Sequence, residues 1–483
     1  MNNSLLAKEL VDAWEQIGVK ECVFCSGARS YPLLVELKKR NHIQLFTFPE
    51  ERSAAFFALG RSRLKKEPVC IITTSGTAAG ELLPACMEAY YSGDPLLLVT
   101  SDRPRRYRGS GAPQSAEQVG LFQKYVEFEL DISAGESCSL NSWSQTFPAH
   151  QNVCFEDPLR NESKGVHSKS LFSSPLVIVS RLSLKQREPV INYLRALGAP
   201  CYLEATSGLR EEPSLAHLRV YQEEKILENS SENDYPIDGI LRIGGVPTLS
   251  FWRELSLPVR SYSELPFKGL EHGEMLSELP SLSLTISPEK WLKAEDKARS
   301  HLNELLDKYP QSEPAFIRAL SQFIPSNSFI YLGNSQPIRH WDLAATYEIS
   351  HPDVAASRGL NGIDGQISTF LGMCRSNTPN IAIIGDLTAL YDLAAFWAMP
   401  QMENRDITVV VINNGGGGIF SRVFAEKELQ NCHRLRYSSI AEFWGLSHSH
   451  QLESGKQLIE LLPDLQQTEA FWDQYKNMHC MAS

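Results

Sequence analysis

Two segments of this chain, one at each end, alternate short apolar runs with longer amphipathic stretches. In the first hundred residues, helical spacing predicts helices at 4–17, 31–39, 52–64 and 77–90, and apolar runs predict strands at 21–25, 43–48, 69–73 and 96–100. From residue 313 onward, the same reasoning predicts helices at 315–323 and 388–399, and strands at 328–332, 381–384 and 407–412. Strands that alternate with helices predict parallel sheets with helices on both faces. We therefore expect an α/β protein with two doubly wound, parallel-sheet domains.

The region between these segments has a weaker pattern. Residues 133–174 are rich in Ser and Asn and are predicted to form a long irregular connection, with short strands later at 200–203 and 239–243. The tail from 438 to 462 is predicted to be helical with turns. A length of 483 residues allows two to four domains of ~100–200 residues each. We predict three domains, at 1–182, 183–312 and 313–483, of which the central one is a smaller α/β domain.

Charge and hydropathy exclude several classes of protein. The chain carries 46 basic and 57 acidic side chains, a net charge of −11, which argues against a dedicated nucleic-acid binder. No apolar run approaches the ~20 residues that span a bilayer, and the first residues lack the basic start and apolar core of a secretory signal. We therefore expect a cytoplasmic enzyme without a membrane span. Cys22 and Cys25 form a CxxC pair within a predicted strand, where two packed thiols are the simpler interpretation.

The sharpest chemical signal lies near the C-terminal end of the sequence. Residues 385–386 read Gly-Asp directly after one predicted strand, and residues 413–414 read Asn-Asn directly after the next. Because neighbouring parallel strands end at the same edge of a sheet, a carboxylate and an amide oxygen converge there. Such hard oxygen ligands suit Mg²⁺, which also retains water and phosphate oxygens. The glycines at 415–418 would let the backbone approach a diphosphate closely.

Three more motifs follow predicted strands in the first segment, and each has a structural alternative. Residues 49–52 read Pro-Glu-Glu-Arg, where the carboxylates could be catalytic or could only stabilise a helix N-terminus. Residues 74–77 read Thr-Ser-Gly-Thr, which could bind a ligand or only cap a helix. Four arginines lie between residues 103 and 108, where an anion site and a solvated basic face both remain open.

Together these motifs resemble the thiamine diphosphate-dependent decarboxylases. The 28 positions from Asp386 to Asn414 match the spacing of that superfamily's magnesium–diphosphate motif. Within the superfamily, the chain is most similar to the family of 2-succinyl-5-enolpyruvyl-6-hydroxy-3-cyclohexene-1-carboxylate synthases of menaquinone biosynthesis. The blocks that carry this resemblance occur in family order, at residues 26–30, 50–53, 74–78, 102–104, 361–365 and 416–420.

The resemblance implies a fold, an activity and a set of site residues. It implies a three-domain thiamine diphosphate-binding fold, with a pyrimidine-binding domain first, a central domain, and a diphosphate-binding domain last. The family decarboxylates 2-oxoglutarate and adds the resulting carbanion to isochorismate, using thiamine diphosphate with Mg²⁺ or Mn²⁺. Carried over by motif, Glu51 is the acid–base partner of the aminopyrimidine, and Asp386, Asn414 and the carbonyl of Gly416 bind the metal. Further cofactor contacts are implied for Thr74, Ser75, Gly76, Gly385, Leu387, Gly417, Ile419 and Phe420. Substrate contacts are implied for Arg29, Arg103, Gln114, Ser335, Arg339 and Arg358.

The resemblance also implies a homo-oligomer, either a dimer or a tetramer, in which Glu51 of one subunit meets the diphosphate domain of another. The sequence departs from the family pattern at Ala28, Pro113, Gly415 and Ser250, where Ser, Asn, Asp or Asn, and Lys are usual. Two alternatives to the synthase activity are a different thiamine-dependent 2-oxo acid decarboxylase or carboligase, and a non-catalytic paralogue that binds ligands.

Overall fold

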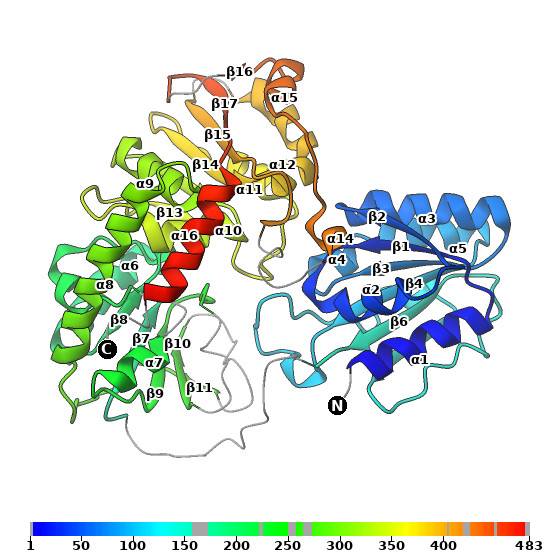
Figure 1. Cartoon of the computed structure of the whole chain (residues 1–483), viewed down its shortest axis with the longest axis horizontal. Coiled ribbons are helices and arrows are strands. Elements are labelled where there is room, and N and C mark those ends of the chain that lie inside the picture. Colours follow the sequence, from blue (N-terminus) through cyan, green and yellow to red (C-terminus); the bar gives the residue numbers. More distant parts are fainter. Residues whose placement is uncertain are drawn as a thin grey trace. The chain divides into compact units, whose positions relative to one another are not determined.

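Parallel β-sheets form the framework of the chain, as the alternating pattern predicts. The computed structural model describes residues 3–156, 172–221, 226–249, 257–263, 273–402, 405–418, 426–448 and 452–478. Three sheets lie in two compact units, of which the first comprises Met1–Asn161 with Gly415–His433 and the second comprises Glu162–Asn414 with Arg434–Ser483 (Figure 1). The predicted α/β fold class is confirmed.

The first unit contains a six-stranded parallel sheet in the order β2-β1-β3-β4-β6-β5. Its strands are β1 (Glu21–Cys25), β2 (Gln44–Phe48), β3 (Val69–Thr73), β4 (Leu96–Asp102), β5 (Phe128–Ser133) and β6 (Ala149–Cys154). Its helices are α1 (Asn3–Gln16), α2 (Tyr31–Leu37), α3 (Glu51–Lys65), α4 (Thr77–Gly80) and α5 (Leu83–Ser92), with α14 (Lys427–Gln430) from the later segment.

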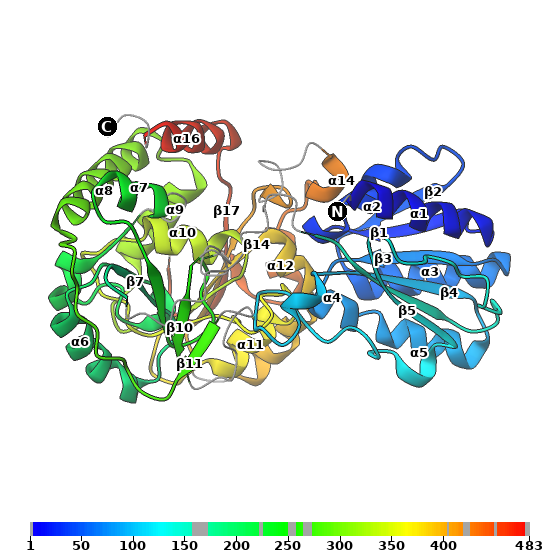
Figure 2. The same cartoon turned by 90° about the horizontal axis from the view of Figure 1, so that it is seen from below.

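Helices cover both faces of this first sheet because alternate strand residues point in opposite directions (Figure 2). In β1, Cys22 and Phe24 pack with α1 and α2. Val23 and Cys25 pack instead with α3 and α5 on the opposite face. The strand is therefore buried along its whole length, as a central parallel strand requires.

The second unit begins with a five-stranded parallel sheet in the order β11-β10-β9-β7-β8. Its strands are β7 (Pro175–Val179), β8 (Cys201–Leu203), β9 (Gly239–Ile243), β10 (Val259–Tyr262) and β11 (Gly273–Leu276), and its helices are α6 (Leu184–Leu197), α7 (Ile226–Glu232) and α8 (Glu289–Lys308). The proposed domain boundary at 182 separates β7 from this sheet, yet β7 pairs with β8 and β9. By strand pairing, the central sheet therefore begins before residue 182.

The third sheet completes the second unit, in the order β13-β12-β14-β15-β17-β16. Its strands are β12 (Phe329–Leu332), β13 (Val354–Ala355), β14 (Asn380–Gly385), β15 (Ile407–Ile412), β16 (Ser447–His448) and β17 (Lys456–Leu461). Its helices are α9 (Glu313–Phe323), α10 (Gln336–Ala344), α11 (Gln366–Met373), α12 (Asp386–Tyr391), the 3-10 helix Leu393–Gln401, α15 (Ser438–Phe443) and α16 (Leu465–Met478). With strands numbered within each sheet, the first and third sheets share one order, 2-1-3-4-6-5.

Four predictions of local structure are wrong. The single helix expected at 388–399 is divided into α12 and the 3-10 helix Leu393–Gln401. Residues 133–174, expected to be irregular, contain β6, which lies between β4 and β5. The tail expected to be helical contains β17, which lies between β15 and β16. The single helix expected at 77–90 is two helices, α4 and α5, because Pro84 opens α5 at its second position and starts a new helix.

Candidate active site

The predicted site residues gather at the carboxyl ends of parallel strands, where α/β sheets bind ligands. In the first sheet, the loops after β1, β2, β3 and β4 carry Arg29, Glu51, Thr74–Gly76 and Arg103. In the third sheet, the loops after β12, β13, β14 and β15 carry Ser335, Arg358, Asp386 and Asn414. The two sheets with the same strand order thus each bring four predicted segments to one edge.

Glu51 is the first residue of α3, and its side chain is buried, with 6% of its surface exposed. The neighbouring Glu50 performs the capping role, since its carboxylate accepts hydrogen bonds from the backbone N–H groups of Arg52 and Ser53, both at 2.9 Å. Burial raises the pKa of the Cys25 thiol, and the nearby Glu51 and Glu50 carboxylates raise it further. The two adjacent glutamates thus differ in their surroundings. The Glu50 carboxylate caps α3, and the Glu51 carboxylate is buried.

The loop 74–76 has a backbone that requires glycine. Gly76 has φ +90°, and a Cβ atom there would lie 3.2 Å from Cα of Gln114. The N–H of Gly76 donates to Oε1 of the buried Gln118 over 2.9 Å. Gly27, after β1, packs against Thr74 so closely that a Cβ atom would lie 2.3 Å from the Thr74 Cβ. The loops after β1 and β3 therefore touch, and Gln118 fixes the second of them.

Arg29, Arg103 and Gln114 lie in the loops after β1 and β4. Nη1 of Arg29 donates to the carbonyl of Phe155 over 3.1 Å. Nε of Arg103 donates to the carbonyl of Pro113 over 2.7 Å, which couples the arginine to the residue before Gln114. Gln114 itself has φ +55°, a left-handed conformation. Pro113 is one of the departures from the family pattern, and its carbonyl still accepts a hydrogen bond from Arg103.

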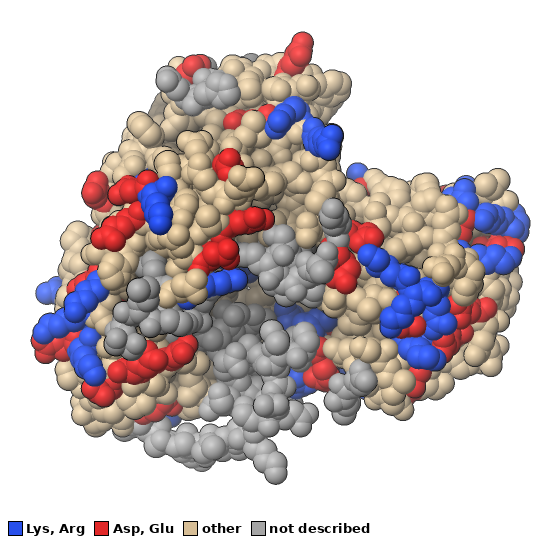
Figure 3. Space-filling model, viewed as in Figure 1, with Lys and Arg blue, Asp and Glu red and all other residues tan. Residues whose placement is uncertain are grey.

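The other arginines of the cluster are paired with carboxylates. Arg105 binds Asp131 and Glu136, at 2.8 and 2.7 Å, and Arg108 binds Asp131 at 2.7 Å. Arg106 binds Glu156. Hydrogen bonding by Arg108 and Asn152 lowers the pKa of Asp131 to about 2, although burial opposes this shift. On the face shown in Figure 3, acidic and basic side chains likewise lie interspersed. Arg105, Arg106 and Arg108 therefore form neither an anion site nor a solvated basic face, because carboxylates of the same unit neutralise their charges.

Asp386 begins α12 at the end of β14 and is 3% exposed. Its Oδ1 accepts a hydrogen bond from the N–H of Leu387 over 2.7 Å, and its backbone carbonyl accepts the hydroxyl of the buried Tyr437. Burial raises the pKa of Tyr437, and the Asp386 and Glu460 carboxylates add to the shift. The phenol therefore stays protonated and donates to the backbone beside the predicted metal ligand.

Asn413 and Asn414 each donate their side-chain amide to a different buried glutamate. Nδ2 of Asn413 lies 2.6 Å from Oε1 of Glu460, and Nδ2 of Asn414 lies 3.1 Å from Oε2 of Glu313. Oδ1 of Asn414 is buried and has no hydrogen-bond partner among the residues that the structure describes. Gly385 at the end of β14 pairs in register with Ile412 at the end of β15, so Asp386 and Asn414 follow neighbouring strands at the same edge of the sheet. A buried amide oxygen in this position fits a divalent cation.

The described residues contain no group of three or more His, Cys, Asp or Glu side chains that could hold a metal. The predicted site would not form such a group, because it combines one carboxylate with an amide oxygen and a backbone carbonyl. The donor set present therefore fits a hard, partly hydrated cation such as Mg²⁺ better than a transition metal that needs sulfur or imidazole.

From Gly415 onward, the glycine run after β15 belongs to the first unit. Gly416 has φ +142°, and a Cβ atom there would lie 2.5 Å from the carbonyl oxygen of Gln430, so only glycine fits. Gly415 has φ +82°, and its carbonyl accepts the N–H of His433 over 2.9 Å. A left-handed backbone favours Gly, Asn and Asp, so this conformation suits both Gly415 and the Asp or Asn that is usual at this position. Ile419, Phe420 and Ser250 lie outside the described residues.

Ser335 and Arg339 lie together at the start of α10. Ser335 has φ +72° and ψ −123°, and its carbonyl accepts Nη1 of Arg339 over 2.5 Å. The preceding residue, Asn334, accepts Nη1 of Arg358 over 2.7 Å through its Oδ1. Asn334 also donates to the carbonyls of Ser357 and Gly362, at 2.8 and 2.7 Å. Arg358 is thus bound to Asn334, the neighbour of Ser335, and Ser335 is bound to Arg339 one helical turn later. These contacts link the three predicted substrate residues of the second unit.

Glu204, at the end of β8, is a buried carboxylate near Arg358. Its Oε1 accepts the backbone N–H of Thr248 over 2.5 Å. Burial raises the pKa of Glu204 to about 7, although the Arg358 guanidinium opposes the shift. This residue extends the set of charged groups around Arg358 into the central sheet.

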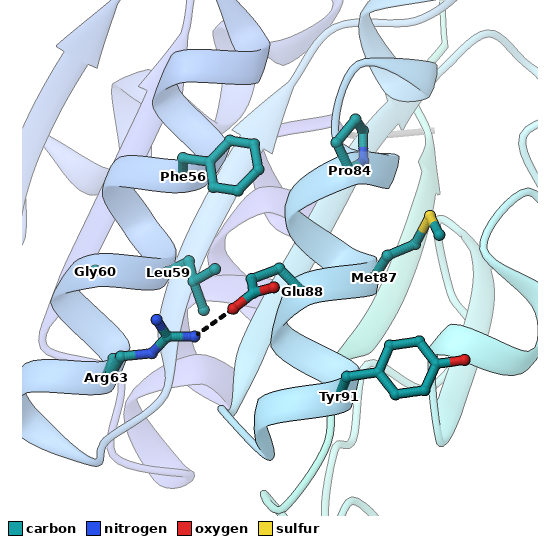
Figure 4. Close-up of a pocket in the computed structure, with 8 residues that line it drawn as sticks. All are labelled: Phe56, Leu59, Gly60, Arg63, Pro84, Met87, Glu88 and Tyr91. Atoms are coloured by element: carbon teal, nitrogen blue, oxygen red, sulfur yellow. Dashed lines mark hydrogen bonds and ion pairs between the residues drawn. The ribbon is translucent and has the colours of Figure 1, made fainter.

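A surface hollow of about 620 Å³ lies on the first unit. It runs between α3 and α5, and the salt bridge from Arg63 to Glu88 crosses it at 3.2 Å (Figure 4). The residues that line it are Phe56, Leu59, Gly60, Arg63, Pro84, Met87, Glu88 and Tyr91. Its walls are mainly apolar, and none of them is a predicted site residue.

Comparison with known proteins decides between the families. Residues 6–121 match the family described as thiamine pyrophosphate enzyme, N-terminal TPP binding domain. A 2-succinyl-5-enolpyruvyl-6-hydroxy-3-cyclohexene-1-carboxylate synthase of Bdellovibrio bacteriovorus is 40% identical to this chain, over 98% of the chain and 99% of its own length. The chain belongs to this synthase family. Synthases of the same name from Akkermansia muciniphila and Renibacterium salmoninarum are 38% and 29% identical over 94% of the chain, and over 95% and 91% of their own lengths. These synthases match nearly the full chain, so the family membership extends through all three sheets.

Sequence reasoning missed four residues near the predicted site. Asn334 and Glu313 bind predicted site residues directly, His340 lies beside Glu313, and Glu204 interacts electrostatically with Arg358. Asn334 had a detectable signal, since residues 333–335 read Gly-Asn-Ser directly after a strand. Glu313 looks like an ordinary acidic residue in the first turn of a helix. Glu204 and His340 have no sequence signal that separates them from structural residues. Among the described residues, no helix has the length and hydropathy to cross a membrane.

Proposed function

We propose that this protein decarboxylates 2-oxoglutarate and joins the remaining four-carbon unit to isochorismate, giving 2-succinyl-5-enolpyruvyl-6-hydroxy-3-cyclohexene-1-carboxylate and CO₂ in menaquinone biosynthesis. The observation that carries the proposal is the 40% identity to a synthase of that name over essentially the whole of both chains. The buried carboxylate of Glu51 at the strand edge of the first sheet supports it independently.

Glu51 is the proposed catalytic residue. Thiamine diphosphate, when bound, supplies the electron sink that decarboxylation of a 2-oxo acid requires. With the cofactor bound, the Glu51 carboxylate would hold a proton in a hydrogen bond with the aminopyrimidine ring, and its burial would strengthen that hydrogen bond. The loops 74–76 and 385–387, with Gly417, are the proposed contacts to the rest of the cofactor, together with Ile419 and Phe420.

The divalent cation, Mg²⁺ or Mn²⁺, is assigned to Asp386, Asn414 and the carbonyl of Gly416. Two of these three ligands are supported by the buried Asp386 and by Oδ1 of Asn414, which has no partner within the described part of the chain. A cation held by these residues would neutralise charge on the diphosphate, which would let an acidic protein bind a polyanion.

The substrate carboxylates and hydroxyls are assigned to Arg29, Arg103, Gln114, Ser335, Arg339 and Arg358. Arginine forks match carboxylates in two-pronged hydrogen bonds, and both substrates are anionic. The links from Arg103 to Pro113 and from Arg358 to Asn334 hold two of these forks in fixed orientations.

The oligomer and the location of the protein are also proposals. We propose a homodimer or homotetramer in which Glu51 of one subunit serves the cofactor bound to the diphosphate domain of another. A cytoplasmic location and the absence of a nucleic-acid partner rest on the sequence composition.

The test is an assay of adduct formation with a matched pair of variants. Purified protein receives thiamine diphosphate, Mg²⁺, 2-oxoglutarate and isochorismate, and mass spectrometry follows the adduct. We expect adduct from the wild type and a loss of at least about a hundredfold with Glu51→Gln, the typical size of a general acid–base contribution. The control is Glu50→Gln, which changes the adjacent helix cap and should keep activity within a few-fold.

Two outcomes would contradict the proposal. Release of CO₂ without adduct would mean that the acceptor is not isochorismate, and would favour another thiamine-dependent carboligase. Failure to bind thiamine diphosphate at all, measured by isothermal titration calorimetry, would favour a non-catalytic paralogue.

A further inference from the structure

Glu313 is a buried carboxylate to which the proposed chemistry gives no role, and it contacts a proposed metal ligand. It is the first residue of α9 and is 4% exposed. Its Oε2 accepts Nδ2 of Asn414 over 3.1 Å. Its Oε1 lies 3.2 Å from Nδ1 of His340 on α10.

This contact determines which end of the Asn414 amide faces Glu313. An asparagine side chain carries an oxygen at one end and an NH₂ group at the other, and only the oxygen binds a cation. An ionised carboxylate accepts hydrogen bonds and cannot donate them, so it selects the NH₂ group. The Oδ1 of Asn414 is then directed away from Glu313, and it is this oxygen that lacks a partner among the described residues.

Three elements hold the Glu313 carboxylate in place. Ser312 caps α9, and the N-terminus of this helix favours a negative charge on its first residue. The backbone N–H of Glu313 donates to Oγ1 of Thr468 in α16 over 3.1 Å. His340 packs its ring against Trp472 of the same helix, with the ring centroids 5.5 Å apart. The backbone of Glu313 and the His340 ring beside its carboxylate are therefore both held by contacts with α16.

We propose that Glu313 is a positioning residue that orients the Asn414 amide so that its oxygen binds the divalent cation. The inference rests on the proposed role of Asn414 as a metal ligand. Partners of metal ligands that fix their orientation typically contribute ~10–100-fold to metal affinity.

The experiment measures Mn²⁺ binding directly, by electron paramagnetic resonance, in protein saturated with thiamine diphosphate and free of substrate. The informative variant is Glu313→Gln, which keeps the shape but adds an NH₂ group that can face Oδ1 of Asn414. We expect the Kd for Mn²⁺ to rise about tenfold or more. Glu313→Asp, which keeps the charge, should restore part of the affinity.

The matched control is Glu295→Gln. Glu295 is also a buried glutamate of the same unit, 1% exposed, and accepts hydrogen bonds from Nε1 of Trp291 at 3.0 Å and the N–H of Tyr221 at 2.8 Å. Its replacement should lower the melting temperature without changing the Kd for Mn²⁺. In turnover assays, Glu313→Gln should raise the apparent KM for the metal and leave kcat within a few-fold at saturating Mn²⁺.

Three results would overturn the inference, and Asp386→Ala separates the first two. If Glu313→Gln binds Mn²⁺ as tightly as the wild type while Asp386→Ala abolishes binding, the metal site is correct and Glu313 has only a structural role. If Asp386→Ala also binds Mn²⁺ like the wild type, the proposed metal site fails, and the role of Glu313 fails with it. A lower melting temperature alone, with an unchanged Kd, also contradicts the proposal.

Discussion

Ser335 combines a strained backbone with a proposed substrate contact. Its φ of +72° and ψ of −123° lie where glycine is favoured, and a serine held there costs about 1–3 kcal/mol. The side chain does not cap α10, so capping does not explain the serine. Strain of this kind is tolerated where a side chain is needed for another purpose, which here is the proposed contact with substrate.

We expect Ser335→Gly to raise stability by about 1 kcal/mol because glycine relieves the strain. The same variant should raise KM for at least one substrate, because the hydroxyl is lost. Differential scanning fluorimetry and steady-state kinetics measure the two effects. The control, Ser326→Gly in an exposed turn, should change neither by much. A lower melting temperature for Ser335→Gly than for Ser326→Gly would refute the strain argument.

Several proposed site residues could be located from the sequence because they closely follow apolar strands, whereas their roles were implied by the resemblance to the synthase family. The parallel arrangement then brings them to one edge whatever the details of packing, as for Glu51 and Asp386. Glu313 could not be predicted in this way, since it contacts Asn414 across 101 positions of sequence. A side chain that acts through a distant partner leaves no local pattern in the sequence.

At the scale of elements, an ion pair ties β1 to the helix that carries Glu51. Glu21 in β1 accepts Nε and Nη2 of Arg61 in α3, at 2.8 and 2.6 Å, and also pairs with Lys65. The hydrogen bonds from Arg61 are the main cause that lowers the pKa of Glu21 to about 2, from 4.5. The pair therefore anchors α3 two to four turns beyond the proposed catalytic carboxylate.

This pair predicts a specific pH dependence. A lowered pKa in the folded state means that the stabilisation is present above pH 4.5 and is lost as the pH falls toward about 2. At neutral pH we expect Glu21→Gln to lower the free energy of unfolding by about 2 kcal/mol. The difference from the wild type should shrink steadily below pH 4.5, as urea unfolding at several pH values would show. Glu88→Gln, on the exposed partner of Arg63, should have almost no effect. A Glu21→Gln penalty that stays constant with pH would contradict this account.

Two of the strands that the sequence did not predict, β6 and β17, have buried polar side chains. In β6, His150 and Asn152 are fully buried and bind Oγ1 of Thr100, at 2.8 and 3.0 Å. In β17, the buried Gln457 and Glu460 bind Thr408 and Asn413 on the neighbouring part of the sheet. A hydropathy pattern treats such residues as exposed, because it contains no information about the partners that satisfy them.

At the scale of the whole molecule, the two outer sheets share one strand order, and each carries half of the proposed site. The sheet of the first unit presents Glu51, and the third sheet presents Asp386 and Asn414. The site that we propose therefore requires one edge of each kind. If the edges come from different subunits, as we propose, activity depends on the oligomer.

Mixing two inactive variants tests this dependence. Glu51→Gln and Asp386→Ala chains, mixed in equal amounts and allowed to exchange subunits, should recover about a quarter of wild-type activity if sites are shared across a dimer. Half of the dimers are then mixed, and each has one intact site of two. Native mass spectrometry verifies the exchange. Mixed dimers without activity would place both halves of the site in one chain.

The sequence by itself determined the α/β class, the strands of each sheet that are apolar throughout, and the residues that follow them. It could do so because hydrophobic periodicity and strand-end motifs are local. Tertiary structure alone decided the polar strands β6 and β17, the shared order of the outer sheets and the neutralisation of Arg105, Arg106 and Arg108. It also decided the contact of Glu313 with Asn414. Each of these depends on a partner far away in the sequence, and a buried polar group is stable only where folding brings that partner within hydrogen-bonding distance.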